Sequence, residues 1–393
     1  MKKILFCTDS LIMGGQEKVS IDYLKMLSEN SEYEISLLIN EDNGKEGNIF
    51  INDIPQKIKY KFVIEKEIIL KINKYRELKK RNLIYKILYN YYLEKRKKFY
   101  KRNIKKLVTK TEYNYLIDFS CQLPIELCDS RVISWIHTDV NSWKEKRIKE
   151  LGKKIEKIGK LIVLNESNKK DLKKLFFNNE EKIEKIYNPF NIEKIKEISL
   201  DKSLLTIREK ELIEDKYFLA CCRLDKLKDI DTLIESYKVL KDKYSIKEKL
   251  YIIGDGEEKE RLENLVKKYK LENNILFLGL QKNPYVWMKN AKFFIHSSFR
   301  EGLPTVIIEA LITNGMVISS DCPVGPREIL EDERYGVLFP VGDKEKLVEK
   351  IYMILFDKNI VEKYRDEAKK RVEDFSKYKI KSRIIEVLNK VKF

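Results

Sequence analysis

The chain has 393 residues, of which 43% are hydrophobic, 80 are Lys or Arg and 63 are Asp or Glu, so its formal net charge is +17. This length and apolar content are sufficient for two ordinary domains, each with its own core. No stretch approaches about 18 apolar residues and Asp9 interrupts the apolar opening, so we expect neither a membrane span nor a secretory signal. The six cysteines lack metal-ligand spacing, which favours reduced core thiols over zinc or disulfides.

The chain opens with a strand, a loop and a helix. Residues Lys3 to Thr8 form an apolar run typical of a buried parallel strand. The loop that follows contains Gly14-Gly15, and a helix is expected from there to about Ser28. The loop lacks the spacing G-x-G-x-x-G, which argues against a dinucleotide site. It is either a tight connection or a phosphate-binding turn, and a second strand, Ile35 to Ile39, leads into an irregular polar passage.

The segment Lys66 to Lys110 concentrates the charge of the chain. It holds 17 Lys or Arg against three Glu, a net charge of +14, whereas the other 348 residues carry only +3. Tyrosines and aliphatic residues at helical spacing lie between the charges, and no Gly or Pro interrupts them, so helices are expected. The segment is a solvated basic hairpin, a surface for anionic lipid headgroups or a nucleic-acid surface. We favour the lipid surface, because no nucleic-acid-binding motif is present.

The remainder of the first half alternates short strands and helices. Strands are expected over Tyr115 to Phe119, Arg131 to Ile136 and Lys160 to Leu164, with a short helix from about Pro124. His137 ends the second of these strands, where it either faces a ligand or is a structural histidine hydrogen-bonded to the backbone. The other histidine, His296, lies in an apolar strand and is expected to be a satisfied core residue. A polar passage, Ile192 to Lys216, is the expected linker.

The second half begins with a strand over Tyr217 to Cys222. Arg223 and Lys228 follow it in one loop, where both can reach one diphosphate, although composition alone predicts ordinary surface charge. The sequence Asp229-Ile230-Asp231 matches a D-x-D metal motif, but Asp229 is placed as an N-cap, so no metal is expected. Two further strands, Leu250 to Ile253 and Ile275 to Leu278, lead into turns that contain Gly254 and Leu280.

Residues Ala291 to Gly315 combine a buried strand, a polar turn and a helix start. The strand is Lys292 to His296, and the helix is expected from Pro304 to Thr313. Gly302 permits close backbone approach, and the helix start at Leu303 to Thr305 presents free N–H groups to an anion, for which phosphate is the natural guest. Glu309 lies inside the apolar helix, where a carboxylate needs a hydrogen-bond partner from a core network or from ligand hydroxyls.

Several motifs together resemble the family 4 retaining glycosyltransferases of the GT-B type. They are Glu301 and Glu309 around G-x-P, the segment Arg223 to Lys228, the segment Ile186 to Asn191 and the run Asp321 to Leu330. The last of these resembles members that extend lipid-linked or cell-surface glycans. The resemblance implies an α/β fold with two Rossmann-like β/α/β domains that face a central cleft. It divides the chain into an acceptor-side domain, 1–195, a nucleotide-sugar domain, 196–376, and a C-terminal helix, 377–393, that crosses back to the first domain.

The resemblance also implies an activity: transfer of a sugar from a nucleotide sugar, expected to be a UDP-linked hexose or N-acetylhexosamine, to a hydroxyl of a glycan or lipid-linked oligosaccharide, with retention at the anomeric carbon. Glu301 would touch the sugar hydroxyls, His137 the sugar near its reacting face and Glu309 the ribose. Arg223 and Lys228 would hold the departing diphosphate in place of a metal. The donor is a substrate, and no cofactor is expected. The remaining donor-binding residues implied are Gly14, Gly15, Gly254, Leu280, Gly302, Leu303, Pro304 and Thr305.

These inferences predict a cytoplasmic enzyme that is peripheral on the inner face of the cell membrane. Its partners would be the donor, the acceptor and an anionic membrane surface that binds Lys66 to Lys110, without nucleic acid. Two other functions remain open. A nucleotide-sugar 2-epimerase has the same architecture but uses no acceptor. A non-enzymatic nucleic-acid-binding protein would explain the charge but not the pair Glu301 and Glu309.

Overall fold

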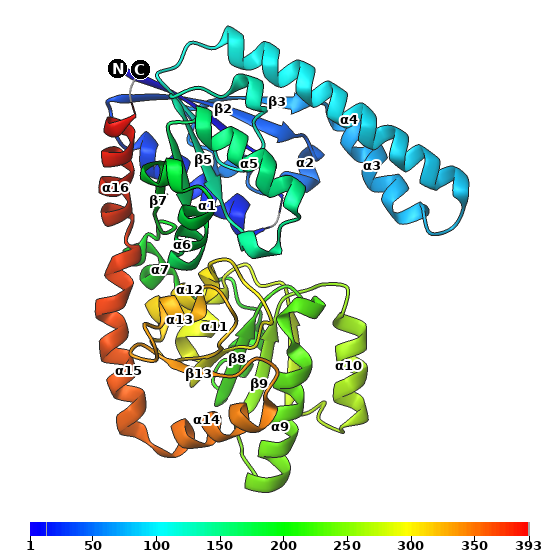
Figure 1. Cartoon of the computed structure of the whole chain (residues 1–393). Coiled ribbons are helices and arrows are strands. Elements are labelled where there is room, and N and C mark those ends of the chain that lie inside the picture. The colour runs from blue at the N-terminus through cyan, green and yellow to red at the C-terminus, as the bar shows by residue number, and fades with distance from the viewer. Residues whose placement is uncertain (13, 392–393) are drawn as a thin grey trace. The chain divides into compact units, whose positions relative to one another are not determined.

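A computed structural model describes residues 1–12 and 14–391, so the end of the expected helix 377–393 lies partly outside the described residues. The chain forms two compact units, residues 1–189 with the segment from 380 onward, and residues 190–379. Each unit contains one parallel sheet flanked by helices (Figure 1). The expected α/β class with two Rossmann-like halves is therefore confirmed.

The sheet of the first unit has seven parallel strands in the order β3-β2-β1-β4-β5-β6-β7. The chain builds outward from β1 to one edge and then returns to the other side of β1, so the order reverses between β1 and β4. Ligands bind at such a switch point, beyond the carboxyl ends of the strands. The strands are β1 (Lys2–Thr8), β2 (Tyr33–Glu41), β3 (Lys59–Ile64), β4 (Tyr115–Asp118), β5 (Val132–Ile136), β6 (Lys160–Val163) and β7 (Ile183–Lys185).

The central strands of this sheet are buried on both faces, as their apolar runs predict. All five residues of β5 are buried, for example, and the ring of Trp135 from this strand packs with the rings of Tyr23 and Phe119. The flanking helices are α1 (Gly15–Ser28), α2 (Gly44–Gly47), α3 (Lys66–Leu78), α4 (Leu83–Lys110), α5 (Glu145–Lys157), α6 (Glu166–Leu175) and α16 (Lys377–Lys390), with 3₁₀ turns η1 (Ile51–Asp53), η2 (Ile125–Leu127), η3 (Val140–Ser142) and η4 (Phe177–Lys182).

The sheet of the second unit repeats the same order with six strands, β10-β9-β8-β11-β12-β13. Its switch point lies between β8 and β11, where Phe293 and Phe294 are opposite Phe218 and Leu219. The strands are β8 (Tyr217–Cys221), β9 (Lys249–Ile253), β10 (Ile275–Gly279), β11 (Phe293–His296), β12 (Val317–Ser320) and β13 (Val337–Phe339).

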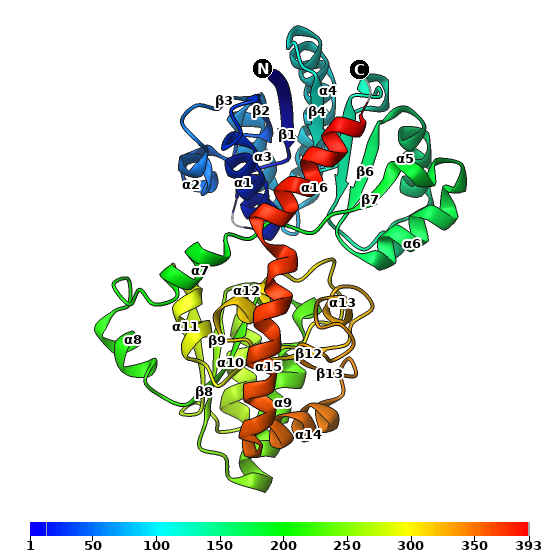
Figure 2. The same cartoon turned by 90° about the vertical axis from the view of Figure 1, so that its left-hand side faces the viewer.

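The helices of the second unit surround this sheet, and the last of them, α15, leads into α16 of the first unit. Figure 2 shows α16 lying along the first unit, where Ile380, Ile384, Val387 and Leu388 form its buried face. The helices are α7 (Ile192–Ile198), α8 (Ile207–Leu212), α9 (Ile230–Tyr244), α10 (Lys259–Lys268), α11 (Pro284–Asn290), α12 (Thr305–Thr313), α13 (Pro326–Ile329), α14 (Lys344–Phe356) and α15 (Lys358–Arg371), with 3₁₀ turns η5 (Lys226–Lys228) and η6 (Val372–Phe375).

Two local expectations were wrong. The passage after β2 was expected to be irregular, but it contains β3, an edge strand whose first three residues are exposed and form no continuous apolar run. The short helix expected from about Pro124 is present as the 3₁₀ helix η2, with Pro124 as its N-cap. The expected linker, Ile192 to Lys216, contains α7 and α8, and the latter begins with a capping box between Thr206 and Glu209.

The basic segment forms the helical hairpin expected from its periodicity. Helices α3 and α4 lie side by side and extend away from their sheet (Figure 1). Asn82 caps the second helix, since its side chain accepts from the N–H groups of Ile84 and Tyr85 at 2.6 and 3.3 Å. Within the described part of the chain, no helix has the length and apolarity needed to span a bilayer.

Candidate functional site

Two loops meet at the switch point of the second sheet. One follows β8 and carries Lys228, and the other follows β11 and carries Glu301. The Ser297 hydroxyl donates to the Lys228 carbonyl at 2.8 Å, and the Phe299 N–H donates to the Leu227 carbonyl at 2.8 Å. Since β8 and β11 are neighbours in the sheet, the sheet order brings these loops together although they are some 70 residues apart.

Glu301 is the centre of the charges at this edge. Its Oε1 accepts from the Lys228 ammonium at 2.6 Å and lies 3.0 Å from Nε2 of His296. Burial alone would raise the pKa of Glu301, but the hydrogen bond and charge of His296, together with the charge of Lys228, outweigh it and lower that pKa to about 2. Glu301 is therefore a carboxylate at any physiological pH, able to accept hydrogen bonds only.

His296 was expected to be a satisfied core histidine, and it is buried and satisfied, but it also orients Glu301. Its Nδ1 lies 3.0 Å from the Ser319 hydroxyl, which fixes the ring while Nε2 faces the carboxylate. This contact with Glu301 was missed because the residue lies in an apolar run. The signal that could have found it is its place at the carboxyl end of β11, beside the switch point, which is the argument applied to His137.

The structure does not bring Arg223 to this cluster. Its side chain is 75% exposed and forms an ion pair with Asp225 at 2.6 Å within its own loop. Lys228, by contrast, is only 22% exposed and engages Glu301. Leu280, at the end of β10, is 63% exposed. Of the two basic residues predicted to hold a diphosphate, the structure places Lys228 against a predicted catalytic residue and leaves Arg223 in solvent.

The N-terminus of α12 follows directly from the Glu301 loop. Pro304 stands at the N-cap rather than at the first helical position expected, and no side chain caps the helix. The neighbouring α9 differs, because Asp229 caps it and the Asp229 carboxylate accepts from the Thr232 N–H. A carboxylate therefore already occupies the start of α9, whereas no side chain caps the start of α12, whose positive dipole end is of the kind that binds phosphate in proteins.

Glycines shape the backbone around this helix start. Gly325, in the run Asp321 to Leu330, has φ +101°, and a Cβ there would lie 2.5 Å from Pro304 Cδ and 3.1 Å from the Gly302 carbonyl oxygen. Gly254 has φ +137°, and a Cβ there would overlap the Cys222 carbonyl. Because Gly254 has no Cβ, the backbone after β9 can approach the loop after β8 closely. The ends of β8 and β9 therefore pack together.

Glu309 has a partner within the protein. It is 9% exposed, and its Oε1 accepts from the hydroxyl of Tyr285 on α11 at 2.9 Å. This bond supplies the core-network partner that a carboxylate in an apolar helix requires. Tyr285 was not identified from the sequence, because nothing in the pattern of α11 marks which of its residues faces α12.

The two carboxylates of the D-x-D sequence are both engaged. Asp229 caps α9, as predicted, and Asp231 forms a bidentate pair with Arg261 at 2.7 and 2.6 Å. Within residues 1–12 and 14–391 there is no cluster of three or more His, Cys, Asp or Glu side chains that could hold a metal ion.

At the carboxyl end of β1 in the first unit, Gly14 is the N-cap of α1 and Gly15 is its first residue. A Cβ at Gly14 would lie 2.2 Å from Oε2 of Glu17, so the glycine makes room for that carboxylate. Burial raises the pKa of Glu17, although the Ser10 hydroxyl donates to it at 3.3 Å. Gln16 reaches the Ser120 hydroxyl at 3.1 Å, which ties this turn to the loop after β4.

His137 lies at the end of β5 and contacts the same loop. Its Nε2 is 2.7 Å from the Phe119 carbonyl, so Nε2 carries the proton and Nδ1 is left as the acceptor. Burial lowers the pKa of His137 to about 4, and the bond to Phe119 opposes this only in part. His137 is therefore neutral at physiological pH. This contact is the backbone hydrogen bond that the structural alternative predicted.

A buried ion pair at this edge was not identified from the sequence. The Lys154 ammonium on α5 lies 2.5 Å from Asp118, and the two side chains are 5% and 3% exposed. Asp118 also accepts from the N–H groups of Gln122 and Leu123 and from the Ser134 hydroxyl. The pair holds the loop that contacts both His137 and Gln16. A strand-end aspartate gave the only sequence signal.

Helix α4 also reaches the carboxyl edge of the first sheet. Arg96 forms an ion pair with Glu41, at the end of β2, at 2.5 Å. The Tyr100 hydroxyl donates to the Gln122 carbonyl at 3.1 Å, and burial raises the pKa of Tyr100. The middle of α4 therefore lies at the carboxyl edge of the first sheet, whereas the first turns of α4 lie away from this edge.

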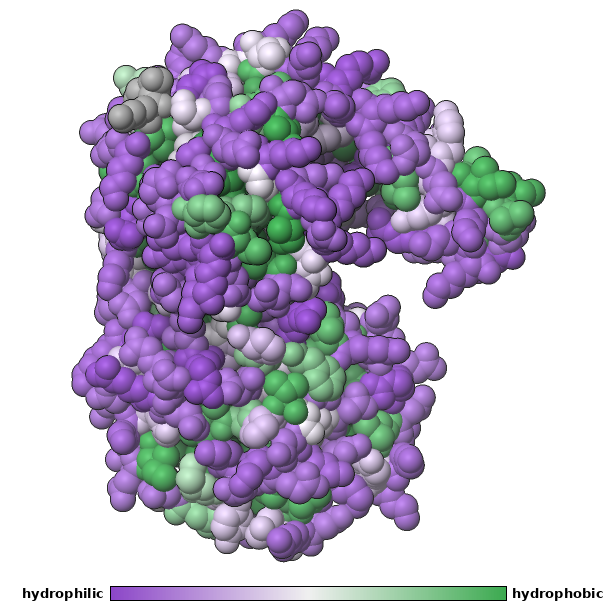
Figure 3. Space-filling model, viewed as in Figure 1, coloured by the Kyte–Doolittle hydropathy of each residue, from purple (hydrophilic) through white to green (hydrophobic). Residues whose placement is uncertain are grey.

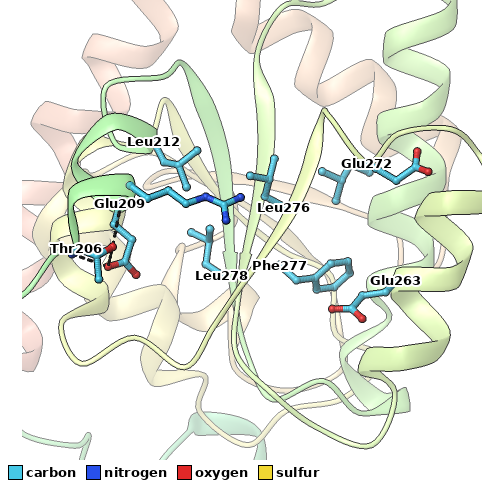
Figure 4. Close-up of a pocket in the computed structure, with 10 residues that line it drawn as sticks. Thr206, Glu209, Leu212, Glu263, Glu272, Leu276, Phe277 and Leu278 are labelled. Atoms are coloured by element: carbon cyan, nitrogen blue, oxygen red, sulfur yellow. Dashed lines mark hydrogen bonds between the residues drawn. The ribbon is translucent and has the colours of Figure 1, made fainter.

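A groove of about 400 Å³ lies elsewhere in the second unit, against the edge strand β10 (Figure 4). Leu276, Phe277 and Leu278 of β10 form its floor, with Thr206 and Leu212 on one side and Glu263 on the other. No residue predicted for the donor site lines it. The groove is separate from the switch point, because β10 is at the edge of the sheet and β8 and β11 are at its centre.

Two doubly wound units are the architecture of the GT-B glycosyltransferases, and a solved structure supports this for the whole chain. HepE of Anabaena, in complex with UDP and glucose, superposes with a TM-score of 0.73 over 99% of this chain and 100% of that chain, at 17% identity.

Sequence relatives identify the family. A protein-family model described as "Glycosyl transferases group 1" matches residues 205–371. N-acetylgalactosamine-N,N'-diacetylbacillosaminyl-diphospho-undecaprenol 4-alpha-N-acetylgalactosaminyltransferase of Campylobacter jejuni is 30% identical over 66% of this chain and 67% of that protein. An uncharacterized glycosyltransferase of Methanocaldococcus jannaschii is 39% identical over 43% of this chain, but the match spans only 41% of that protein. The chain therefore belongs to the group 1 glycosyltransferases, of the family 4 type, and the predicted resemblance is confirmed.

Proposed function

We propose that this glycosyltransferase transfers a hexose or N-acetylhexosamine from a UDP-sugar to a hydroxyl of a glycan or lipid-linked acceptor, with retention at the anomeric carbon, in the synthesis of a surface polysaccharide. The observation that carries the proposal is the group of Lys228, Glu301 and His296 beside the uncapped N-terminus of α12. It joins a cation and free N–H groups, which suit a diphosphate, to an ionised carboxylate, which suits sugar hydroxyls.

The reaction breaks the bond from the anomeric carbon to the donor diphosphate and forms a bond to the acceptor oxygen. Negative charge develops on the departing diphosphate. Lys228 has three donor hydrogens, so it can keep Glu301 and still donate to a phosphate oxygen, and the first N–H groups of α12 provide further donors. Arg223, long and exposed, is proposed to join them when the diphosphate binds. These donors replace a metal in the proposal, and no cofactor is required.

The sugar itself is assigned to Glu301 and His137. Glu301 accepts hydrogen bonds from sugar hydroxyls, and His296 and Lys228 keep it ionised. His137 is neutral, with Nε2 bound to the Phe119 carbonyl, so Nδ1 is the atom it offers to a donor group of the ligand. Glu309, which already accepts from Tyr285, is proposed to accept a hydrogen bond from the ribose as well. Gly14, Gly15, Gly254, Leu280 and Gly302 remain proposed donor contacts.

Two relatives support the choice of substrates. HepE was crystallised with UDP and glucose, and the Campylobacter relative is named as an N-acetylgalactosaminyltransferase that acts on a diphospho-undecaprenol-linked sugar. We therefore propose a UDP-sugar donor and, as acceptor, a glycan carried on a lipid diphosphate. The enzyme is proposed to work at the inner face of the cell membrane, held there by the +14 charge of Lys66 to Lys110.

A panel of UDP-sugars, screened by the shift that each causes in the unfolding temperature, identifies the donor. UDP release is then measured with and without lipid-linked acceptors, and the product is examined by NMR for its anomeric configuration. Acceptor-dependent UDP release with an α-linked product from an α-linked donor supports the proposal. A changed sugar configuration at C2 without acceptor would instead identify a nucleotide-sugar 2-epimerase.

A further inference from the structure

The far end of the α3–α4 hairpin carries large apolar side chains in solvent. Leu83, Ile84, Ile87 and Tyr91 are 71%, 63%, 60% and 57% exposed. Leu83, Ile87 and Tyr91 are four residues apart, so they form one stripe along the first turns of α4 with Ile84 beside it. Figure 3 shows a hydrophobic patch at this end of the hairpin, surrounded by hydrophilic surface. We call these four residues the hairpin tip.

The hairpin tip is held away from the core. The buried residues of α3 are Ile68, Ile69 and Ile72, and those of α4 are Ile104 and Val108, so full burial is confined to the base of the hairpin, while Tyr89, Tyr92 and Leu93 pack only partly against the core. Twenty residues of helix separate Ile84 from Ile104, which is about 30 Å. The apolar tip therefore projects beyond the surface of its own unit, where burial against this chain does not account for it.

The tip is also ordered, which distinguishes it from a loose surface loop. Asn82 caps α4 at the turn between the helices. Tyr75 stacks between Tyr85 and Tyr92 at centroid distances of 6.1 and 5.6 Å, and the Lys79 ammonium lies 4.4 Å from the Tyr89 ring. The inner faces of the two helices are thus joined by aromatic contacts, and the outer apolar stripe of α4 is presented on a fixed scaffold.

The chemistry around the tip matches the interface of an anionic bilayer. Residues 79–93 contain four Lys or Arg, four Tyr, five Leu or Ile and no Asp or Glu. Basic residues are attracted to anionic headgroups, tyrosine favours the headgroup level, and aliphatic side chains favour the acyl boundary. A soluble protein partner with an acidic face would satisfy the lysines but would not explain the exposed apolar stripe.

We propose that the hairpin tip inserts Leu83, Ile84 and Ile87 into the acyl boundary of an anionic membrane, so that attachment has an apolar component besides the electrostatic one. This deepens the proposed function, on which it rests for the membrane-bound acceptor. Electrostatic attachment alone disappears at high salt, since salt screens exposed charges, whereas buried apolar area persists. The full chain should therefore retain part of its vesicle binding at about 0.5 M salt.

The test compares three full-length proteins by co-sedimentation with vesicles of phosphatidylcholine, alone or mixed with phosphatidylglycerol. The tip variant carries Leu83→Gln, Ile84→Gln and Ile87→Gln, which keep helix propensity and touch no core residue. The control variant carries Leu200→Gln, Leu204→Gln and Ile207→Gln, which are 70%, 56% and 82% exposed in the second unit. The tip variant should bind mixed vesicles about tenfold more weakly at low salt and lose the salt-resistant fraction, while the control binds like wild type.

Equal binding by the tip variant and wild type, or no binding of wild type to either vesicle, overturns the proposal. So does a change of oligomeric mass in the tip variant by light scattering, which would make the tip a contact between copies of the chain. The shift that UDP causes in the unfolding temperature is measured in parallel. A UDP shift without vesicle binding removes this inference alone, whereas vesicle binding without a UDP shift removes the proposed donor and leaves the inference standing.

Discussion

The two sheets have the same strand order, yet the ion pairs at their carboxyl edges differ in how deeply they are buried. In the first unit, Asp118 and Lys154 are 3% and 5% exposed, and Asp118 also accepts from two backbone N–H groups and a hydroxyl. In the second unit, Glu301 and Lys228 are 13% and 22% exposed, and the loop of Glu301 leads into a helix N-terminus that no side chain caps. A buried pair that is hydrogen-bonded to its own loop shapes that loop, whereas a partly open pair can exchange hydrogen bonds with a ligand.

The largest expected effect tests the buried pair. Lys154→Met leaves Asp118 buried without its counter-charge, which should destabilise the first unit by about 3–5 kcal/mol. The measurement is urea-induced unfolding followed by tryptophan fluorescence. The double variant Asp118→Asn with Lys154→Met removes both charges and should recover part of the loss. An unchanged unfolding midpoint in the single variant would show that the pair is not a structural element of this edge.

The open pair should respond in activity rather than in stability. Lys228→Ala removes one preorganised donor to the departing diphosphate and should lower kcat/KM by about 2–4 kcal/mol in transition-state free energy. Arg223→Ala should have a loss in the same range if the exposed side chain joins the diphosphate, as we propose. Thermal unfolding of both variants checks that the fold is kept. Near-normal turnover of either one removes that residue from the mechanism.

The pH dependence of stability distinguishes the two edges further. His137 has its pKa lowered to about 4, against about 6.5 in the unfolded chain, so the unfolded state binds more protons between these values. Stability should therefore fall as the pH drops from about 6.5 to 4, by at most about 3 kcal/mol. His137→Asn should flatten this slope. Because the chain has only two histidines, NMR titration of the imidazole signals checks the pKa directly, and an ordinary value near 6.5 for His137 would contradict the prediction.

The ionisation of Glu301 should also make stability fall as the pH drops, but at a lower pH than that of His137. Its pKa is lowered to about 2, so its contribution to stability is complete above its usual range and is lost as the pH falls through that range toward 2. Glu301→Gln should remove this dependence. The unfolding midpoint of wild type and variant, compared from pH 5 down to about 3, measures it. Parallel curves over that interval would mean that His296 and Lys228 do not hold the carboxylate ionised.

The smallest effect is expected at Asp229. Asn caps a helix as well as Asp and tolerates the left-handed conformation found there, with φ +47°, so Asp229→Asn should change stability by less than about 1 kcal/mol and leave activity near normal. The companion measurement is activity in EDTA, which should be unaffected. Loss of activity in EDTA with recovery in manganese would restore the metal interpretation of Asp229-Ile230-Asp231.

Local patterns by themselves determined much of this protein. Apolar runs located the buried strands of both sheets, the absence of Gly and Pro predicted the basic helices, and Asp229 was recognised as a cap, because each of these depends on neighbours within a few residues. The pair of glutamates and the segment Arg223 to Lys228 identified the family. The exposed start of β3 shows the limit, since an edge strand lacks the apolar signal of a central one.

Only the tertiary structure decided which charges meet. Lys228 pairs with Glu301, 73 residues away, because β8 and β11 are neighbours at the switch point, and Lys154 pairs with Asp118 because α5 packs against the end of β4. Neither distance follows from spacing along the chain. The same holds for exposure. The aliphatic residues of α4 have the spacing of ordinary helix residues. Only the structure shows that the long stretch of helix before Ile104 leaves Leu83, Ile84 and Ile87 in solvent.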